Sequence, residues 1–336
     1  MLPRVNFVRA MHFFVLTVLI VVIVPIEINL PFFLAFFCLM VAYPRDERRK
    51  QIPSINILEY FDMALLSVKE IARAANQGKF LVFYQPQISS EHWQPLYVEA
   101  LVRWRRDDGT IIPPSAFLSR INSTKKLDIL GRHVIRQSLQ DLCLMRRVNP
   151  ELKLAVNVNI SQLETKGFVA FVERELIKNR VKPYNLELEL TEVGLDRLSN
   201  RAGNALTKLK KLGVSLALDD FGKGGSGKTR LQSMDWDTLK IDRNDLKDLI
   251  DNPKSITLLS SVIQLGKANK LRVVAEGVET QMQALTLKAM GVDELQGYLF
   301  AKPMNITQTQ DWLLSYADDV RARRLRLAQS KSNVSA

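Results

Sequence analysis

The stretch LELELTEVGLDRLSNRAGNALTKLKKLGVSLALDD, from Leu186 to Asp220, decides the fold class. It begins with a short apolar run, Leu186–Thr191, continues through a helical pattern, Asn200–Leu212, and ends in a second apolar run at 214–219. A strand, a helix and a strand in this order are typical of a β/α unit with parallel strands.

The same order of apolar run and helical pattern continues on both sides of this stretch. Further strand-like runs fall at residues 80–85, 97–103, 152–159, 238–242, 272–276 and 294–300, with helical patterns between them, for example at 168–179 and 255–268. Eight strands joined by helical crossovers predict an α/β fold of the TIM-like (β/α)8 barrel class. From the residues alone, all eight strands would be parallel.

Most of these runs end in an acidic or amide side chain. The residues are Glu99, Asn159, Glu189, Asp219, Asp220, Asp242 and Glu276. Reactive groups of a β/α barrel gather at the C-terminal ends of its strands, so we expect these side chains to meet. So many carboxylates in one place repel one another unless cations lie between them. Because the set holds oxygen donors and neither histidine nor cysteine, the sequence predicts a hard divalent ion such as Mg²⁺ or Mn²⁺.

Eight short motifs make the chain similar to a known family. In chain order they read YQP at 84–86, EALVRW at 99–104, VNIS at 158–161, ELTE at 189–192, DDFG at 219–222, KID at 240–242, AEGVET at 275–280 and QGYLFAKP at 296–303. The set resembles the EAL phosphodiesterase family, whose members hydrolyse the bacterial second messenger cyclic di-GMP. The resemblance covers about residues 62–316. It implies a metal-dependent hydrolase that opens cyclic di-GMP to linear pGpG.

The resemblance also implies roles for the strand-end residues. Two ions, Mg²⁺ or Mn²⁺, would be held by Glu99, Asn159, Glu189, Asp219, Asp220 and Glu276, with Asp219 bridging both. Such a pair of ions acidifies a bridging water and neutralises charge on the phosphate. Lys240 would point at this water, and Lys240, Glu276 and Glu99 would form the catalytic group.

Other matched residues would contact the substrate or hold the site in shape. The substrate contacts would be Gln85, Arg103, Asp242 and Gln296, since a forked arginine suits phosphate. Gln296 would also help to position the water and the metal shell. Glu192 would anchor the loop that follows Glu189. The family further implies that the first strand runs antiparallel and that two barrels pair in a homodimer.

Two places depart from the family pattern. The segment 222–229 reads GKGGSGKT, so that Lys223, Gly225 and Gly227 stand where threonine, tyrosine and serine are usual. This segment fits the spacing of a phosphate-binding Walker loop, but two carboxylates occupy the strand end before it and no separate nucleotide-hydrolase sheet is visible. Tyr97 stands where a glycine usually precedes the EAL motif. The altered loop leaves one alternative open: a weak or inactive EAL module that acts as a cyclic di-GMP receptor or protein-interaction domain.

Residues 1–43 predict a transmembrane hairpin. Two apolar pieces, 11–24 and 30–43, are separated by Pro25, Glu27, Asn29 and Pro31, and each approaches the roughly 20 residues of a spanning helix once its flanks are included. Basic residues precede the first piece and follow the second, which places both ends in the cytoplasm. The sequence therefore favours a multi-pass protein of the bacterial inner membrane with a cytoplasmic EAL domain. A re-entrant or interfacial hairpin and a signal sequence are the alternatives, although no small-residue cleavage site follows the first piece.

The remaining segments complete the domain plan. A juxtamembrane linker and stalk helix at 44–61 lead into the barrel at 62–316, and an amphipathic pattern at 57–75 predicts one helix across that boundary. We expect the hairpin and this helix to support dimerisation, because confinement to a membrane raises effective concentration.

The formal net charge is +12, and basic residues cluster in the segment after the hairpin and in a basic tail at 317–336. Attraction to anionic lipid headgroups and simple solvation are both consistent with this tail. No pattern for DNA recognition is present in the sequence.

Overall fold

The computed structural model describes residues 67–118, 121, 123–195, 198–221, 231, 234–246 and 253–318. The chain divides into two compact units, Met1–Asn56 and Ile57–Ala336, and all described residues belong to the second. The predicted hairpin at 1–43, the linker at 44–61, the glycine-rich loop at 222–229 and most of the tail at 317–336 lie outside the described residues. Among the helices that are described, none combines the length and the apolar character that a membrane span requires.

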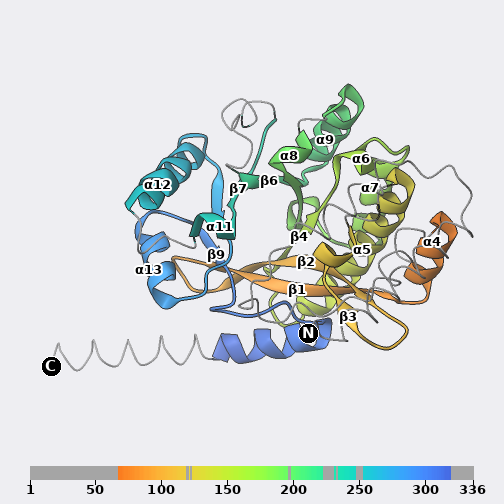
Figure 1. Ribbon diagram of the computed structural model, residues 1–336, viewed down its shortest axis with the longest axis horizontal. Coiled ribbons are helices and arrows are strands. Elements are labelled where there is room, and N and C mark those ends of the chain that lie inside the picture. Colours follow the sequence, from red (N-terminus) through yellow and green to blue (C-terminus); the bar gives the residue numbers. More distant parts are fainter. Residues whose placement is uncertain are drawn as a thin grey trace, which may run out of the picture. The chain divides into compact units, whose positions relative to one another are not determined.

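In the described residues, nine strands form one sheet, and eight of them close into a barrel (Figure 1). They are β1 (Phe80–Ser89), β2 (Pro95–Arg105), β3 (Ile111–Ile112), β4 (Lys153–Asn157), β5 (Leu186–Thr191), β6 (Ser215–Phe221), β7 (Thr238–Ile241), β8 (Arg272–Ala275) and β9 (Glu294–Gln296). The order β1-β9-β8-β7-β6-β5-β4-β2-β3 and a pairing of β1 with β2 close the ring, with β3 as an extension of β2. The predicted barrel is therefore confirmed.

β1 runs antiparallel to both of its neighbours, β2 and β9, while the other neighbours in the ring are parallel. The expectation from the family is confirmed, and the all-parallel arrangement suggested by the residues alone is wrong. The short connection between Ser89 and Pro95 explains the difference, because a tight turn joins antiparallel strands whereas parallel strands need a crossover. This hairpin pairs Gln85 with Glu99.

The last strand is shorter than predicted, since β9 ends at Gln296 and not at residue 300. A Cβ at Gly297 would lie 2.0 Å from the carbonyl oxygen of Val278, so only glycine fits this close approach. The amide of Val278 donates to Gln296 O (3.0 Å), and the amide of Leu299 donates to Val278 O (3.0 Å). The chain therefore turns around Val278 instead of extending the strand.

Helices cover the outside of the barrel, with α5, α7 and α9 on one side of the strands and α12 and α13 on the other (Figure 1). The described helices are α4 (Val68–Asn76), α5 (Thr124–Met145), α6 (Ile160–Leu163), α7 (Phe168–Lys178), α8 (Glu192–Leu195), α9 (Asn200–Leu212), α11 (Arg243–Leu246), α12 (Pro253–Ala268) and α13 (Gln281–Ala289). α9 matches its predicted bounds because Ser199 caps its start and Gly213, at φ 94°, ends it.

The predicted helix at 57–75 does not run through Ser67, which has an extended backbone and is the N-cap of α4. The Ser67 hydroxyl accepts a hydrogen bond from the Glu70 amide (3.2 Å), and Glu70 Oε2 accepts one from the Ser67 amide (2.6 Å). This capping box marks the start of α4, so the prediction of one continuous helix over 57–75 is wrong. The segment 57–66 lies outside the described residues.

Alternation along the strands sorts side chains between two environments. In β5, Leu186, Leu188 and Leu190 join the large apolar cluster that also contains side chains of α5, α7 and α9. Glu187 and Glu189 point the other way, into the barrel, and both are buried. Apolar side chains fill most β/α barrels, whereas this interior holds many buried charges, which are costly unless they are paired.

Candidate active site

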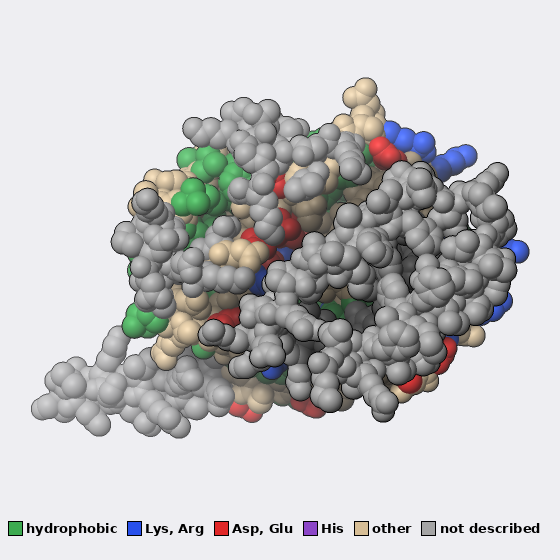
Figure 2. Space-filling model, viewed as in Figure 1, with side chains coloured by type: hydrophobic (Ala, Val, Ile, Leu, Met, Phe, Trp, Pro, Cys, Tyr) green, Lys and Arg blue, Asp and Glu red, His purple; other side chains and the backbone are tan. Residues whose placement is uncertain are grey.

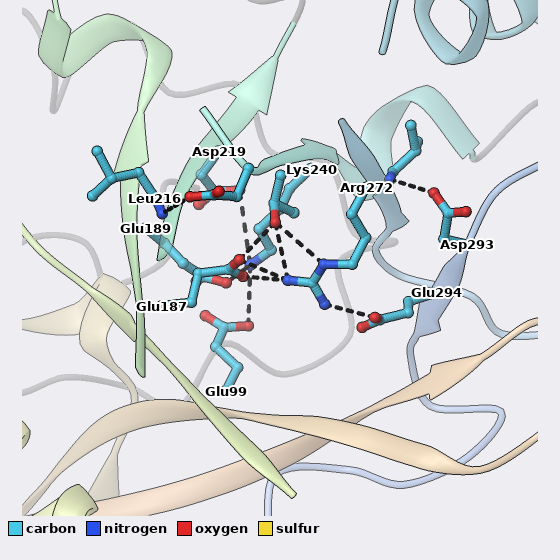
Figure 3. A network of polar contacts seen from close by, with 12 residues as sticks. Glu99, Glu187, Glu189, Leu216, Asp219, Lys240, Arg272, Asp293 and Glu294 are labelled. Carbon is cyan, nitrogen blue, oxygen red and sulfur yellow. Dashed lines mark hydrogen bonds and ion pairs between the residues drawn. The ribbon is translucent and has the colours of Figure 1, made fainter. Parts of the chain in front are cut away.

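Lys240 lies at the centre of the buried polar interior, and its side chain is 0% exposed. Its Nζ lies 2.5 Å from Glu276 Oε1, 2.7 Å from Glu189 Oε1, 3.5 Å from Glu99 Oε2 and 4.0 Å from Asp219 Oδ1 (Figure 3). The acids come from β5, β2, β6 and the end of β8, and the lysine comes from β7. Glu99, Glu189, Asp219 and Glu276 are called the carboxylate cluster below. Acidic side chains are visible near the middle of the face in Figure 2.

Two amide side chains donate to Glu99, and a third, Gln85, contacts one of them. Asn157 Nδ2 donates to Glu99 Oε1 and Gln296 Nε2 donates to Glu99 Oε2, both at 2.6 Å. Gln296 Nε2 also lies 3.3 Å from Gln85 Oε1, and Gln85 Nε2 donates to Ala301 O (3.0 Å). The structure thus brings the predicted residues Gln85 and Gln296 to Glu99, and adds Asn157, which the sequence reasoning missed.

Asn159, the amide ligand expected from the motif VNIS, is engaged elsewhere. Its Oδ1 accepts from the Ser161 amide (2.9 Å), and its own amide donates to Gln162 Oε1 (2.9 Å), so it caps α6. Asn157, at the end of β4, takes the place beside Glu99. In the predicted strand at 152–159, positions 157 and 159 would share a face, so strand alternation alone does not distinguish them. The spacing of Asn159 and Gln162, three residues apart, is typical of a capping box and could have indicated that Asn159 begins a helix.

A bulge at the end of β6 separates the paired acids Asp219 and Asp220. The register against β7 shifts between Leu218 and Phe221, and Asp220 has a left-handed backbone with φ 57°, which is uncommon for a residue other than glycine. Asp219 Oδ1 accepts a hydrogen bond from the Asp220 amide (2.8 Å). Bulges re-aim side chains beside active sites, and here Asp219 faces Lys240 while Asp220 is half-buried.

Gly277 fixes the backbone beside Glu276. It has φ 73°, and a Cβ there would lie 2.2 Å from the Arg243 Cβ. The Glu276 amide donates to Ile241 O (3.0 Å), which ties the end of β8 to β7. The glycine of the AEGVET motif thus allows the turn that follows the strand and keeps Glu276 in the cluster.

Burial and charge act in opposite directions on Lys240. Burial disfavours its ammonium, but the four surrounding carboxylates outweigh burial and raise the pKa of Lys240 well above its usual value. The side chain is therefore protonated at neutral pH.

The acids of the cluster share this one ammonium. Burial is the largest cause that raises the pKa of Glu189 well above its usual value and the pKa of Glu276 to about 8, while Lys240 acts in the opposite direction. Burial also acts on Glu99, but Lys240 and the N–H groups of Gln296 and Asn157 outweigh it and hold the pKa of Glu99 below its usual value. The interior therefore carries more carboxylates than its one ammonium neutralises.

This arrangement of strand-end acids around a lysine can be compared with known proteins. The sequence profile described as the EAL domain matches residues 68–303. The chain belongs to the EAL domain family. The resemblance carried by the eight motifs is thereby confirmed.

Curated relatives of this EAL protein include two enzymes of Pseudomonas aeruginosa. Cyclic di-GMP phosphodiesterase PA2567 is 34% identical over 261 residues, which cover 78% of this chain and 44% of the relative. Cyclic di-GMP phosphodiesterase RocR is 31% identical over 260 residues, which cover 77% of this chain and 65% of the relative. The chain spans between 30% and 65% of the length of the first relatives it matches. The solved PaMucR phosphodiesterase in complex with c-di-GMP superposes with a TM-score of 0.66 at 30% identity, and covers 72% of this chain and 99% of that one.

The donor set of this EAL domain fits a hard divalent cation. It consists of carboxylate and amide oxygens with an excess of negative charge, and Gln296 Oε1 is buried without a hydrogen-bond partner in the described part of the chain. Lys240 Nζ occupies the middle of the cluster. Accordingly, no three Asp, Glu, His or Cys side chains among the described residues already stand as a coordination shell.

Arg103 lies half-buried on β2, on the face that carries Glu99. Its Nη1 donates to Val102 O (3.0 Å), and its guanidinium lies 5.6 Å from the centre of the Phe83 ring. Burial lowers the pKa of Arg103, while nearby Tyr298 and Glu99 act in the opposite direction. The predicted substrate arginine therefore lies near the cluster but not in contact with Lys240.

Asp242 and Glu192 lie beside the ends of β7 and β5. Asp242 is buried, and its Oδ1 accepts from the amide (2.7 Å) and from Nδ2 (2.6 Å) of Asn244 at the start of α11. Glu192 is fully buried in the first turn of α8, directly after β5.

Proposed function

We propose that this EAL domain hydrolyses cyclic di-GMP to linear pGpG. The observation that carries the proposal is the buried cluster in which Lys240 meets four carboxylates at the strand ends. Hydrolysis of a phosphodiester needs an activated water and positive charge at the phosphate, and burying charged groups at such cost is typical of catalytic sites. The relatives named as cyclic di-GMP phosphodiesterases support the choice of substrate.

The proposal includes two divalent ions, Mg²⁺ or Mn²⁺. When bound, such ions supply a hydroxide at neutral pH and neutralise charge on the phosphoryl oxygens. The proposed ligands are Glu99, Asn157, Glu189, Asp219, Asp220 and Glu276. Asn157 replaces Asn159 in this set because its amide lies beside Glu99, whereas the Asn159 side chain caps α6.

Lys240 and Glu276 are the proposed groups that act on the attacking water. Lys240 would donate a hydrogen bond and stabilise negative charge in the transition state, because it stays an ammonium in this setting. Glu276, whose Oε1 lies 2.5 Å from Lys240 Nζ, would accept a hydrogen bond from the attacking water. Glu99 would complete the catalytic group by holding its neighbours in place through Asn157 and Gln296.

Substrate contacts are proposed for Arg103, Gln85, Asp242 and Gln296. The half-buried guanidinium of Arg103, on the same face of β2 as Glu99, supports a phosphate contact. The Gln85 amide is bonded to Ala301 O, so a contact with a guanine edge would replace that bond. Glu192 would hold the loop after β5, as its complete burial supports.

The test is a turnover assay with the full-length chain purified in mild detergent. With Mg²⁺ or Mn²⁺ present, cyclic di-GMP should be converted to pGpG. Asp219→Asn should remove this activity, because it takes a charged oxygen from the cluster. Asp107→Asn is the matched control, since Asp107 is 87% exposed and pairs with Lys79 at the surface. Its activity should equal that of the unaltered protein.

A folded protein that binds cyclic di-GMP and leaves it intact with both metals would contradict the proposal. That result would identify the module as a receptor, the alternative that the altered loop at 222–229 raises.

We further propose that residues 1–43 anchor the protein in the inner membrane, with the EAL domain in the cytoplasm and two chains paired. The apolar pieces and their basic flanks support this. Cell fractionation tests it: the full chain should sediment with membranes and resist extraction by high salt and alkali. Release by either treatment would contradict the hairpin.

A further inference from the structure

A second set of polar side chains lies on the strands that carry the site, nearer to the N-terminal ends of these strands. On four strands, one residue of this set comes two positions before a residue of the site: Tyr97 before Glu99 on β2, Glu187 before Glu189 on β5, Thr238 before Lys240 on β7 and Glu294 before Gln296 on β9. On β8, Arg272 comes four positions before Glu276, which directly follows the strand. Side chains two apart on a strand point to the same face, so this set faces the barrel interior. Tyr97, Glu187, Thr238, Arg272 and Glu294 are called the Arg272 layer below.

Arg272 joins the members of this layer through its whole guanidinium (Figure 3). Nη2 lies 2.7 Å from both carboxylate oxygens of Glu187, and Nη1 lies 2.6 Å from Glu294 Oε1. Nε and Nη2 donate to Thr238 Oγ1 at 3.2 and 3.0 Å, and this hydroxyl donates to Glu187 Oε2 (2.6 Å). One side chain of β8 thus ties β5, β7 and β9 together.

Tyr97 adds β2 to the same group. Its ring centre lies 3.8 Å from the Arg272 guanidinium carbon and 5.3 Å from Lys153 Nζ, and the residue is 5% exposed. Stacking on an aromatic face holds a guanidinium in one plane. Tyr97 stands where a glycine is usual in the family, and its ring provides the face on which Arg272 stacks.

We propose that the Arg272 layer sets the positions of the metal-binding carboxylates, with Arg272 and Tyr97 as positioning residues for the site. This inference rests on the function proposed above. The five strands held by the layer are the strands that carry Glu99, Glu189, Lys240, Glu276 and Gln296. Two residues of strand span only about 7 Å, and the four from Arg272 to Glu276 span about 13 Å, so a shift in the layer is passed to the site.

The geometry of the arginine matters more than its charge. Its planar fork meets Glu187, Glu294 and Thr238 at the same time, and a lysine has a single point of contact. Both acids are almost completely buried, at 1% and 2% side-chain exposure, so solvent cannot replace a lost contact. Removing a group that hydrogen-bonds a metal ligand directly typically changes metal affinity or activity by about 10- to 100-fold. Arg272 acts on the proposed ligands through their strands, so we expect the lower end of this range.

The experiment compares Arg272→Lys with Arg132→Lys in the full-length chain. Arg132 is a matched control on α5, outside the barrel: it is 21% exposed against 19% for Arg272, it pairs with Asp128 at 2.9 Å, and it stacks on Phe171 at 4.8 Å. Both variants keep the charge and lose the fork. Mn²⁺ affinity is measured by calorimetry without substrate, and kcat and KM are measured with cyclic di-GMP.

Arg272→Lys should bind Mn²⁺ about 10-fold or more weakly and lose kcat to a similar extent, with little change in KM. Arg132→Lys should lower only the melting temperature. If Arg272→Lys and Arg132→Lys lose the same thermal stability and both bind Mn²⁺ like the unaltered chain, the inference is overturned.

Tyr97→Leu is the second variant, should Arg272→Lys fail to fold. It removes the stacking ring but keeps an apolar side chain, and we expect Mn²⁺ affinity to fall about fivefold, the equivalent of one cation–π contact. Unchanged affinity would overturn the inference. A chain that binds Mn²⁺ without turnover contradicts only the proposed function, whereas an unaltered chain that binds no Mn²⁺ contradicts both.

Discussion

Lys240 holds together four carboxylates that would otherwise repel one another. Its contacts of 2.5 to 4.0 Å reach Glu276, Glu189, Glu99 and Asp219, and the acids keep it charged although it is fully buried. Because one ammonium does not balance four carboxylates, the residues of this interior demand either protons or further cations.

Replacing Lys240 by methionine should make stability depend on metal. Removing one partner of a buried ion pair costs about 3 kcal/mol or more, so Lys240→Met should unfold at lower urea concentration in EDTA, and Mn²⁺ should restore part of the loss. Lys210→Met is the control, since Lys210 pairs with Asp237 (2.8 Å) away from the cluster. An equal loss of stability for Lys240→Met with and without Mn²⁺ would refute this reading.

Asn157 and Asn159 should respond differently to the same change. Asn157→Ala removes the hydrogen bond to Glu99 and a proposed ligand, so turnover should fall about 10-fold or more. Asn159→Ala removes a helix cap, so it should cost about 1 kcal/mol of folding free energy and leave turnover intact. Steady-state kinetics measures the turnover of both variants, and urea unfolding measures their folding free energy. The assignment is wrong if Asn159→Ala is the variant that loses turnover.

At the scale of elements, the strands place the site and short turns refine it. The eight strands could be predicted because each is a local apolar run bounded by turn or helix signals. The place of Asn157 beside Glu99 was not predicted, because the expected strand ran on to residue 159, whereas β4 ends at Asn157 and Asn159 caps α6. The Arg272 layer could not be predicted, because the strand tilt of the closed barrel decides which residues of different strands meet.

The turn after β8 offers a test at this scale. Gly277 and Gly109 both have positive φ, at 73° and 85°, but only a Cβ at Gly277 would clash, at 2.2 Å from Arg243 Cβ. Gly109→Ala should therefore cost about 1 kcal/mol of stability and no activity. Gly277→Ala should cost more stability and shift Glu276, with turnover reduced about 10-fold or more. Equal turnover in the two variants would show that this turn does not hold Glu276.

For the whole molecule, the acidic interior contrasts with a chain whose formal net charge is +12. A positive net charge attracts an anionic ligand at long range, which is favourable for the cyclic di-GMP proposed above as substrate. The first compact unit, Met1–Asn56, carries the apolar pieces on which the membrane proposal rests.

Removing residues 1–56 should weaken pairing of the EAL domains. Chains confined to a membrane plane have a high effective concentration, which a truncated chain lacks. We expect the full-length protein in nanodiscs to be dimeric, and the truncated chain to be mostly monomeric at low micromolar concentration with lower turnover per chain. Light scattering with parallel kinetics measures both. A tight dimer of undiminished activity after truncation would contradict the anchor's role.

The most direct test of the central claim is the fate of cyclic di-GMP in water enriched in ¹⁸O. The full-length protein with Mn²⁺ should release linear pGpG that carries one ¹⁸O atom in its terminal phosphate, because water attacks phosphorus and one ester oxygen leaves. Mass spectrometry reads both the product and the label. Cyclic di-GMP recovered intact from the folded, Mn²⁺-loaded protein would contradict the account.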